Sequence, residues 1–389
     1  RISELGWCEP TLVGPLRACV QTMDGILSKI EDGPMHDEIK DHRGRIHSYY
    51  TGIRRFIELA EEDHVHWIEK SGRAGNVCTL RTAPIDIAPY LREELFNKET
   101  SVTLTSATLS IARDMRPFQN KIGAENETAE MVDSPFDYEK NTRIYIASDV
   151  PVPSPQDQRL ATEVLIDYIR YCVSNVSGGT LVLFTSYSDL RTVSDALQTE
   201  FIDAGRPFFA QGQGMGRSEM TTAFHEAGNG VLFGTDSFWT GVDVPGSSLE
   251  QVIITRLPFD VPTHPIAEAK SEYIKERGGH PFSELTLPEA LVKFRQGLGR
   301  LIRTRNDKGI ITILDSRILQ KSYGRQFLQS LPKPKFIRVR ASPHDKSFRI
   351  DGGDWFNIQA VTILSFRQEL DMRRGILEVE VRFRDKQNR

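Results

Sequence analysis

Residues 180–201 read TLVLFTSYSDLRTVSDALQTEF, and this stretch decides the fold. It opens with an apolar run, continues through serines and an aspartate, and ends with apolar residues at helical spacing. A short continuous apolar run is typical of a strand covered on both faces, and a helix directly after it is typical of a parallel sheet. We therefore predict a strand at 180–186, a polar loop at its carboxyl end, and a helix at 189–201.

The same unit recurs along the chain from about residue 141 to residue 331. Because right-handed crossovers place every strand-to-helix loop at one edge of such a sheet, ligands are expected to bind at the carboxyl ends of the strands. The sequence therefore predicts an α/β fold with a doubly wound parallel sheet. The further strands are expected at 143–149, 207–212, 230–235, 251–258 and 309–316, and the further helices at 161–173, 218–227, 288–303 and 324–331.

Polar loops directly follow five of the apolar runs. Each loop is rich in Gly, Ser, Thr or Asp. One such loop is ordinary turn chemistry, but five at one edge of a sheet indicate a binding surface. The loops are TSAT at 105–108, TSYSD at 185–189, QGQG at 211–214, GTDSFWTGVD at 234–243 and DSR at 315–317.

The segment before the sheet has a different pattern. Apolar residues repeat at helical spacing twice within 10–62, and a Gly-Pro pair at 33–34 separates the two repeats, so we predict a helical hairpin. Beyond the hairpin the pattern changes to alternating strands and helices. We predict strands at 64–69 and 78–85, a helix at 88–96, and a buried strand at 101–109 that runs into a polar loop.

A metal site is not expected. His64 and His66 share one face of a predicted strand, as metal ligands can, but the sequence nearby offers no third ligand. The four cysteines show no zinc or iron–sulfur spacing, which indicates reduced, buried thiols. They are Cys8, Cys19, Cys78 and Cys172.

The net charge of -4 gives no overall basic surface, so a polyanion would have to bind at a local patch. Residues 331–389 are basic, with 13 Lys and Arg against 8 Asp and Glu. Alternating apolar and charged residues predict half-exposed strands at 333–341 and 376–384, with a turn at 351–355. These basic side chains either form a solvated face, which is the favoured reading, or meet nucleic acid.

No apolar run approaches the ~20 residues that a membrane span needs, and no signal peptide is visible. We therefore expect a cytoplasmic protein without a membrane partner. The chain begins at Arg1 rather than Met, which suggests a piece of a longer protein.

Residues 295–305 read RQGLGRLIRTR and crowd four arginines together. Their guanidinium groups are always charged and repel one another unless an anion lies among them. In the predicted helix, Gln296, Arg300 and Arg303 stand at i, i+4 and i+7 and share one face, which the neighbouring glycines keep open. Arg300 and Arg303 therefore suit the phosphate oxygens of a nucleotide. The alternative is a solvent-exposed basic helix whose small residues serve packing.

The loop GTDSFWTGVD supplies further candidates. Gly241 permits a tight turn, and the carboxylate of Asp243 suits a ribose hydroxyl or an arginine. Phe238 and Trp239 are adjacent aromatic residues in a polar loop. They stack on a base or anchor the loop in the core, and the residues alone leave both alternatives open.

These motifs resemble those of the DinG/XPD-like branch of superfamily 2 DNA helicases, and most closely the bacterial DinG-like members. They occur in the family's order and spacing over residues 64–332: TSATL, SPFDY, LVLFTSYSDL, GTDSFWTGVDVPG, LPF and QGLGRLIR. The resemblance implies a RecA-like sheet. It divides the chain into a partial Arch-like helical hairpin at 1–63, the end of motor domain 1 at 64–132, motor domain 2 at 133–332 and an unassigned basic tail, expected to be β-rich, at 333–389.

The resemblance also implies a nucleotide site and a DNA track. The residues that it places at the nucleotide are Gln296, near the γ-phosphate, Arg300 and Arg303, as arginine fingers, Ser106 and Thr108, at the interface of two RecA-like domains, and Gly241 and Asp243, in the fifth helicase motif. Those that it places toward DNA are Thr185 and Ser186, whose hydroxyl and backbone groups suit a phosphate, and Thr235, Ser237 and Trp239 in the loop of the fifth motif. Family members often carry Glu where this chain has Thr240, so the contact made by that carboxylate is not expected here.

No GxxxxGK[ST] stretch occurs in the 389 residues, and no DEAH-like Asp-Glu pair follows an apolar strand ahead of the hairpin. These elements cradle the phosphates and hold Mg2+ in this chemistry. We therefore expect the C-terminal half of an ATP-dependent DNA helicase, with ATP and Mg2+ held mainly by a missing N-terminal motor half and no iron–sulfur cluster in this chain. The expected partners are single-stranded DNA and that other half. The chain alone is expected to be monomeric and inactive as an ATPase.

Two alternatives stay open beside this interpretation. The chain could be a helicase remnant that binds nucleic acid without hydrolysing ATP. It could also be an unrelated α/β enzyme that binds a nucleotide or a sugar phosphate at the same edge of the sheet.

Overall fold

The computed structural model describes residues 1–72, 75–111, 113–152, 158–239, 248–260, 264–332, 335–341, 348–350, 353–354, 361–371 and 376–385. The chain forms two compact units. Unit 1 comprises Arg1–Thr103, Gln119–Glu127 and Val261–Leu285, and unit 2 comprises Leu104–Phe118, Thr128–Asp260 and Thr286–Arg389.

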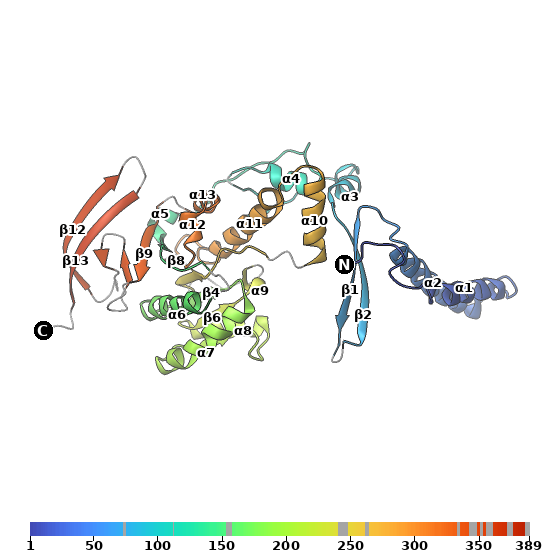
Figure 1. Ribbon diagram of the computed structural model, residues 1–389, viewed down its shortest axis with the longest axis horizontal. Coiled ribbons are helices and arrows are strands. Elements are labelled where there is room, and N and C mark those ends of the chain that lie inside the picture. Colours follow the sequence, from blue (N-terminus) through green and yellow to red (C-terminus); the bar gives the residue numbers. More distant parts are fainter. Residues whose placement is uncertain are drawn as a thin grey trace. The chain divides into compact units, whose positions relative to one another are not determined.

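Unit 2 is built on a sheet of seven parallel strands (Figure 1). In order across the sheet these are β9 (Ile337–Ala341), β3 (Thr142–Ala147), β8 (Gly309–Ile313), β7 (Gln251–Ile254), β4 (Thr180–Leu183), β6 (Val231–Gly234) and β5 (Phe208–Ala210). Every residue of β4, β6 and β7 is buried, as continuous apolar runs predict. Two short strands extend the sheet antiparallel beyond β9, namely β10 (Phe348–Ile350) and β11 (Gly353–Asp354).

Helices alternate with these strands along the chain, so the predicted α/β fold with a parallel sheet is confirmed. The helices of unit 2 are α5 (Tyr138–Asn141), α6 (Gln158–Ser174), α7 (Tyr187–Asp203), α8 (Arg217–Ala227), α9 (Asp236–Trp239), α11 (Leu287–Leu298), α12 (Arg317–Gln320) and α13 (Gly324–Gln329).

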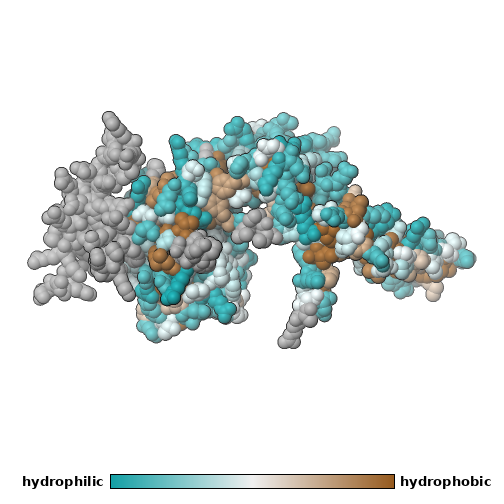
Figure 2. Space-filling model, in the orientation of Figure 1, coloured by the Kyte–Doolittle hydropathy of each residue, from teal (hydrophilic) through white to brown (hydrophobic). Residues whose placement is uncertain are grey.

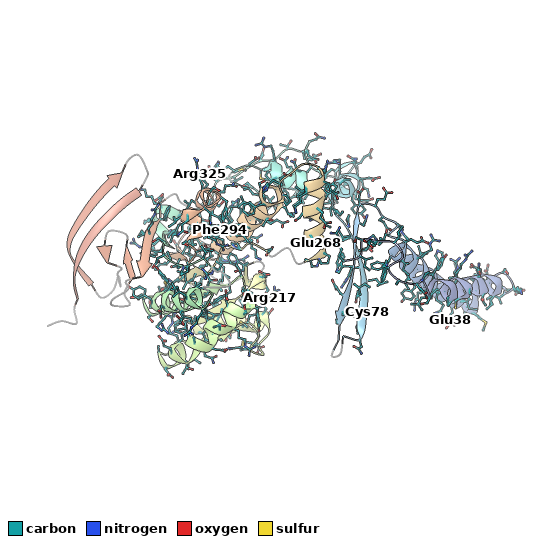
Figure 3. The ribbon with its side chains drawn as sticks, in the orientation of Figure 1. Glu38, Cys78, Arg217, Glu268, Phe294 and Arg325 are labelled. Atoms are coloured by element: carbon teal, nitrogen blue, oxygen red, sulfur yellow. The ribbon has the colours of Figure 1, made fainter. Side chains whose placement is uncertain are left out.

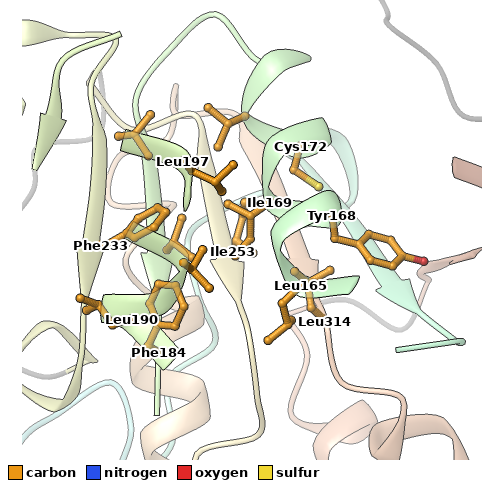
Figure 4. Close-up of a cluster of buried hydrophobic side chains, with 14 of the residues drawn as sticks. Leu165, Tyr168, Ile169, Cys172, Phe184, Leu190, Leu197, Phe233, Ile253 and Leu314 are labelled. Carbon is orange, nitrogen blue, oxygen red and sulfur yellow. The ribbon is translucent and has the colours of Figure 1, made fainter. Parts of the chain in front are cut away.

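The helices cover both faces of the sheet. On one face, Leu165 of α6 and Leu190 of α7 pack with Phe184 in the hydrophobic cluster of Figure 4. On the other face, Phe224 of α8 lies against the backbone just before β4, and the side chain of Leu183 lies against α11. Because successive residues of a strand point to opposite faces, Phe184 and Leu183 mark the two sides, and the sheet is doubly wound.

Unit 1 begins with the predicted helical hairpin, and its elements are confirmed. The helices α1 (Val13–Leu27) and α2 (Pro34–Ile57) pack through their apolar stripes, and Val20 and Phe56 are their buried residues. The face of this hairpin visible in Figure 2 is mainly hydrophilic, as expected for helices that each bury one stripe. Pro34 is the first residue of α2, where a helix needs no N–H donor.

The rest of unit 1 combines segments that are distant in the sequence. The strands β1 (His64–Ser71) and β2 (Val77–Pro84) form an antiparallel pair. Val65 and Trp67 of β1 pack against Ala269, on a helix that comes almost two hundred residues later. The remaining helices are α3 (Ala88–Leu91), which continues as a π-helical turn (Arg92–Phe96), α10 (Pro265–Glu276), a π-helical turn (Phe282–Thr286) and α4 (Arg116–Ile122), whose first three residues belong to unit 2.

This division differs from the predicted domain boundaries. Residues 104–118, with the TSATL motif, group with the sheet of unit 2, and residues 261–285 group with the hairpin unit. Segments far apart in the sequence therefore share a unit. The Arch-like and motor-domain names given to the four predicted segments stay predictions.

The predicted strand at 101–109 is wrong. Residues 101–106 have no regular secondary structure, and Val102 and Leu104 are 37% and 49% exposed. A strand must pair its N–H and C=O groups with a neighbour, and none of the described strands lies alongside this segment. The apolar residues alone therefore do not make a strand here.

The last part of the chain is β-rich, as predicted. The predicted strand at 333–341 begins at Ile337 as β9 and joins the main sheet beside β3. The strand predicted at 376–384 forms β13 (Ile376–Asp385), which pairs antiparallel with β12 (Val361–Asp371). Most of the turn predicted at 351–355 lies outside the described residues.

Candidate functional site

Polar loops lie at the carboxyl edge of the unit 2 sheet, as predicted. Because β4, β5, β6 and β8 are parallel, the loops TSYSD, QGQG, GTDSFW and DSR that follow them share this edge. In Figure 3, Arg217 marks the end of the QGQG loop at the start of α8, and Phe294 marks the buried side of α11. The fifth loop, TSAT, does not follow a strand.

The loop after β4 is held by its own hydroxyl groups. Ser186 Oγ accepts a hydrogen bond from the N–H of Asp189 at 3.3 Å and lies 2.8 Å from Ser188 Oγ, so Ser186 is the N-cap of α7. The next side chain, Tyr187, is 51% exposed. A Cβ on Gly212 would overlap Tyr187 Oη, so the tyrosine side chain would have to shift, and the φ of 92° at Gly212 itself favours glycine.

The loops after β5 and β6 are joined directly. Gln211 Oε1 accepts hydrogen bonds from both the N–H and the hydroxyl of Thr235, each at 2.8 Å. Gln211 thereby fixes the start of the GTDSFW loop. Thr235 and Ser237, which were predicted to face DNA, are both partly exposed at this edge.

The aromatic pair in the same loop anchors it in the core. Phe238 and Trp239 are both 0% exposed, and Trp239 Nε1 donates to the carbonyl oxygen of Phe184 at 2.9 Å. A buried ring cannot stack on a base. Of the two alternatives for this pair, the structure shows the anchoring one, and the predicted DNA contact by the Trp239 ring is wrong.

The helix that carries the arginine-rich stretch ends earlier than predicted. α11 ends at Leu298, and Gly299 caps it by donating its N–H to the carbonyl of Arg295 at 2.9 Å. Arg300 and Arg303 lie in the turn that follows, so they do not share one helical face with Gln296. Glycine is a weak helix former, which favours the break at this position.

Gly297, the other glycine of this stretch, lies against the protein itself. A Cβ at Gly297 would lie 2.9 Å from the ring of Trp239 and 3.1 Å from a methyl group of Leu183. Its lack of a side chain therefore serves packing between α11 and the sheet, rather than the approach of a ligand.

Arg300 is tied to the loop after β6. Its Nε and Nη2 donate to the carbonyl oxygen of Trp239 at 3.2 and 3.0 Å. Arg303 is placed by a compact turn in which Asp307 Oδ2 accepts the N–H groups of Arg303 and Thr304 at 2.8 and 2.7 Å. Burial would raise the pKa of Asp307, but the hydrogen bonds from Thr304 and Arg303 outweigh it and lower that pKa.

Lys293 of α11 joins two further loops, a role that sequence reasoning missed. Its Nζ donates to Asp236 at 2.6 Å, after β6, and to Asp260 at 2.8 Å, after β7. Burial of the ammonium would lower the pKa of Lys293, but the two carboxylates outweigh it and raise that pKa. A lysine on the helix and aspartates in separate loops give no signal of this contact in the sequence.

Arg295 of α11 connects the TSAT loop to the same helix, and this contact was also missed. Its Nη1 donates to the carbonyl oxygen of Ser110 and, at 3.2 Å, to Ser110 Oγ, and its Nη2 donates to the carbonyl oxygen of Ala107 at 3.2 Å. Burial lowers the pKa of the Arg295 guanidinium. Within the loop, Ser106 Oγ accepts the N–H of Thr108 at 3.3 Å.

The loops after β7 and β8 meet at a buried carboxylate. Asp315 is 1% exposed, accepts the N–H of Leu257 at 2.8 Å, and pairs with Arg317 at 2.6 Å. Burial would lower the pKa of Arg317, but the bond to Asp315 outweighs it and raises that pKa. The LPF and DSR motifs are therefore held together at the same edge.

The remaining expectations have different outcomes. The cysteines were expected to be buried, and Cys172 is, but Cys19 and Cys78 are exposed. Gly241 and Asp243, together with the divergent Thr240, lie outside the described residues.

His66 is 2% exposed, with its ring 5.5 Å from that of Phe56 and its Nε2 3.5 Å from the carboxylate of Glu61. Among the residues that the structure describes, no group of three or more His, Cys, Asp and Glu side chains is placed to hold a metal ion. None of the described helices is both long and apolar enough to cross a bilayer.

Known proteins are similar to this chain in sequence and in fold. Residues 169–334 match the family model described as the helicase C-terminal domain. The chain is 33% identical over 284 residues to the ATP-dependent DNA helicase YoaA of Escherichia coli, covering 73% of this chain and 43% of that protein. The chain belongs to the DinG/XPD-like superfamily 2 DNA helicases. It is also 33% identical over 300 residues to the 3'-5' exonuclease DinG of Bacillus subtilis, covering 76% of this chain and 32% of that protein.

This DinG/XPD-like chain thus spans less than half the length of these two curated relatives. A solved structure titled XPD_Helicase has the same fold, with a TM-score of 0.52 and 17% identity, over 84% of this chain and 64% of that one. Residues 343–389 match a different family model, the N-terminal domain of glycosyl hydrolase family 65. That match covers β10 to β13, which the helicase model does not reach.

Proposed function

We propose that this chain is the C-terminal motor half of an ATP-dependent DNA helicase. The whole protein couples ATP hydrolysis to translocation on single-stranded DNA and to unwinding of duplexes. The observation that supports this most directly is α11. In this chain, α11 is hydrogen-bonded to the TSAT loop through Arg295 and to the loops after β6 and β7 through Lys293. The same helix packs closely on the ring of Trp239 at Gly297.

The nucleotide-facing part is Gln296, Arg300 and Arg303, at and just after the end of α11. ATP supplies the phosphoryl group whose transfer to water releases the free energy for movement. Two guanidinium groups suit the charge that develops on the transferred phosphoryl oxygens. The attachment of Arg300 to the Trp239 carbonyl fixes where one of these charges lies.

The fit to ATP is partial, and the missing part is informative. The sequence contains cationic side chains for the phosphates but no GxxxxGK[ST] loop to cradle them and no DEAH-like pair to hold Mg2+. We therefore assign ATP binding and Mg2+ mainly to the other motor half, with Ser106, Thr108, Gly241 and Asp243 approaching the nucleotide from this one.

The DNA-facing part is the carboxyl edge of the sheet at the loops after β4 and β6. Thr185, Ser186, Thr235 and Ser237 offer hydroxyl and backbone donors to phosphate oxygens. Tyr187 is the aromatic residue exposed beside them, and we assign to it the base-stacking role that the buried Trp239 ring cannot take.

Replacement of Arg300 tests the motor function. In the full-length protein that contains this chain, Arg300→Ala should lower the rate of ATP hydrolysis stimulated by single-stranded DNA by at least about 10³-fold, the low end for an arginine finger. Affinity for a fluorescent oligonucleotide should stay within about twofold, because Arg300 faces the nucleotide and not DNA.

Two results would count against the motor. If Arg300→Ala weakens oligonucleotide binding and the wild type hydrolyses no ATP, the chain is a nucleic-acid-binding helicase remnant. If the 389-residue chain hydrolyses ATP alone, the assignment of the phosphate cradle to another half is wrong. The third alternative, an unrelated α/β enzyme, is not supported, because the chain belongs to the helicase family.

A further inference from the structure

We propose that Arg295 is the positioning residue that makes the TSATL loop (105–109) move as one body with α11. Ser106 and Thr108 then keep a fixed position relative to Gln296, the neighbour of Arg295 on the helix. This inference rests on the proposed function, since it explains how one motor half coordinates its nucleotide-facing groups. Neither the motif comparison nor the predicted roles of residues include Arg295.

The contacts of Arg295 span the loop. Its Nη2 donates to the carbonyl of Ala107, in the middle of TSATL, at 3.2 Å, and its Nη1 donates to both the carbonyl and the hydroxyl of Ser110 just after it. Ser110 is 9% exposed, and Arg295 is partly buried. Water therefore competes poorly for the two part-buried hydrogen bonds to Ser110, whereas the hydrogen bond to Ala107 is exposed.

The loop has no other hydrogen bond, among the described residues, that holds it to the sheet. Residues 101–106 are irregular and exposed, and the strand that their sequence predicts does not form. Among the described residues, the other hydrogen bonds of residues 104–110 stay within the segment, between Ser106 and Thr108. Arg295 is thus the hydrogen-bonding link between this segment and the rest of unit 2.

An arginine is required for this geometry. The planar guanidinium presents several N–H groups in a fixed fork and so reaches two carbonyl oxygens three residues apart in the chain. A lysine ammonium is a single point charge and can hold one of them, but not both in a fixed orientation. Because the acceptors are neutral carbonyl oxygens, the link depends on the orientation of the guanidinium N–H groups and not on an ion pair.

Arg295 lies on α11 between residues that contact other parts of the candidate site. Lys293, two residues earlier, holds Asp236 and Asp260, and Gln296 follows directly. One rigid helix therefore carries the TSATL loop, the loops after β6 and β7, and the predicted γ-phosphate contact. A shift of α11 is transmitted to all of them together.

The first experiment measures, in the 389-residue chain, how far Arg295 restricts the motion of the TSATL loop. A nitroxide attached to Thr105→Cys, with Cys8, Cys19 and Cys78 replaced by Ser, reports loop motion in its room-temperature EPR spectrum. The label should be immobilised when Arg295 is intact and mobile in Arg295→Gln, with Arg295→Lys between them. Arg305→Gln is the matched control, because Arg305 lies in the same arginine-rich stretch with an exposed side chain and should leave the spectrum unchanged.

The second experiment measures coupling in the full-length protein. Arg295→Gln should keep basal ATP hydrolysis within about twofold and lower its stimulation by single-stranded DNA at least tenfold, whereas Arg305→Gln changes neither. A merely structural role would lower both rates in parallel. Arg295→Lys, which preserves charge and bulk, should show an intermediate ratio of stimulated to basal rate even if the glutamine variant is poorly folded.

The outcomes separate this inference from the proposed function. An unchanged EPR spectrum in Arg295→Gln overturns the positioning role, and so does a mobile loop with wild-type stimulation by DNA. If the wild-type full-length protein hydrolyses no ATP, the proposed function fails while the EPR comparison still decides whether Arg295 holds the loop.

Discussion

Gly297 and Trp239 lie so close together that a Cβ on the glycine would come within 2.9 Å of the indole ring. The ring is fully buried and is fixed by its hydrogen bond to the carbonyl of Phe184. Because neither the sheet nor the ring can move away easily, α11 is seated at a distance that only glycine permits.

Gly297→Ala should therefore lower the free energy of unfolding by about 1–2 kcal/mol, since overpacking a close contact exceeds the gain in helix propensity. Urea unfolding followed by circular dichroism would measure this. Gly52→Ala is the matched control: Gly52 lies inside α2 with no atom within 4 Å of its added Cβ, so the same change should be neutral or stabilising. Equal effects of the two substitutions would contradict the contact with Trp239.

Arg206 should be among the most sensitive residues outside the candidate site. Its guanidinium donates to the carbonyl oxygens of Val173, Val176, Gly178 and Asn229 at 2.7, 2.5, 2.5 and 2.6 Å. Arg206→Lys leaves most of these partly buried acceptors without a donor, at about 1–3 kcal/mol each when buried. We expect unfolding free energy to fall by at least about 3 kcal/mol.

The same measurement on Arg191→Lys provides the control for Arg206. Arg191 is exposed on α7, and its replacement should change stability by less than about 0.5 kcal/mol. A small effect at Arg206 would mean that its four carbonyl partners find other donors.

Cys172 should make stability fall at high pH. Burial in the core between α6 and the sheet raises the pKa of this thiol from its ordinary 9.0 to about 12, so the folded protein keeps the proton that the unfolded chain loses. The contribution is fully present below about pH 9 and is lost as the pH rises from there toward 12, at about 1.4 kcal/mol per pH unit.

The measurement is the unfolding free energy of the wild type and of Cys172→Ala at pH 8 and pH 10.5. The wild type should lose about 2 kcal/mol more than the variant between these values. Taking this difference removes most of the effect of Tyr145, whose pKa is raised mainly by burial and to a smaller extent by Cys172 itself. A parallel pH dependence in the two proteins would show that the Cys172 thiol is not protected from ionisation.

Tyr187 should contribute to DNA binding through its ring. Tyr187→Ala should weaken binding of the 389-residue chain to an oligo-dT strand by roughly 5- to 150-fold, the value of one base–aromatic stack of ~1–3 kcal/mol. Tyr187→Phe should keep most of the affinity. Fluorescence anisotropy at one fixed salt concentration would measure both.

Tyr49→Ala controls for loss of any exposed tyrosine, because Tyr49 is 64% exposed on α2 and lies in unit 1. It should leave binding unchanged. If Tyr187→Ala also leaves binding unchanged while the wild type binds, the stacking role is refuted but the hydroxyl-lined edge of the sheet is not.

The parallel sheet was predictable because each strand is a continuous apolar run between polar loops, and this pattern depends on local sequence. The strand expected at 101–109 shows the limit of that reasoning. Its apolar residues fit a strand, but a strand also needs a partner, which no local pattern reveals. The helix end at Leu298 was missed for a related reason, since the two glycines beside the predicted stripe of Gln296, Arg300 and Arg303 were interpreted as keeping a helical face open and not as ending the helix.

The candidate site was predictable as a set of loops, and less so as a set of contacts. The placement of TSYSD, QGQG, GTDSFW and DSR at one edge follows from strand direction alone. By contrast, Arg295 reaches Ala107 across 188 residues of sequence, and nothing near either residue indicates the other. The burial of Trp239 likewise depends on Leu183 and Gly297, which lie far from it in the chain.

The several attachments of α11 set how its sequence can vary in length. A residue added or removed between Leu287 and Leu298 would rotate everything after it by about 100°. A change before Lys293 would turn Lys293, Arg295 and Gly297 away from their partners together, and no single substitution could restore them. Homologous chains should therefore differ by insertions and deletions in the loops on either side of this helix, and keep its number of residues constant.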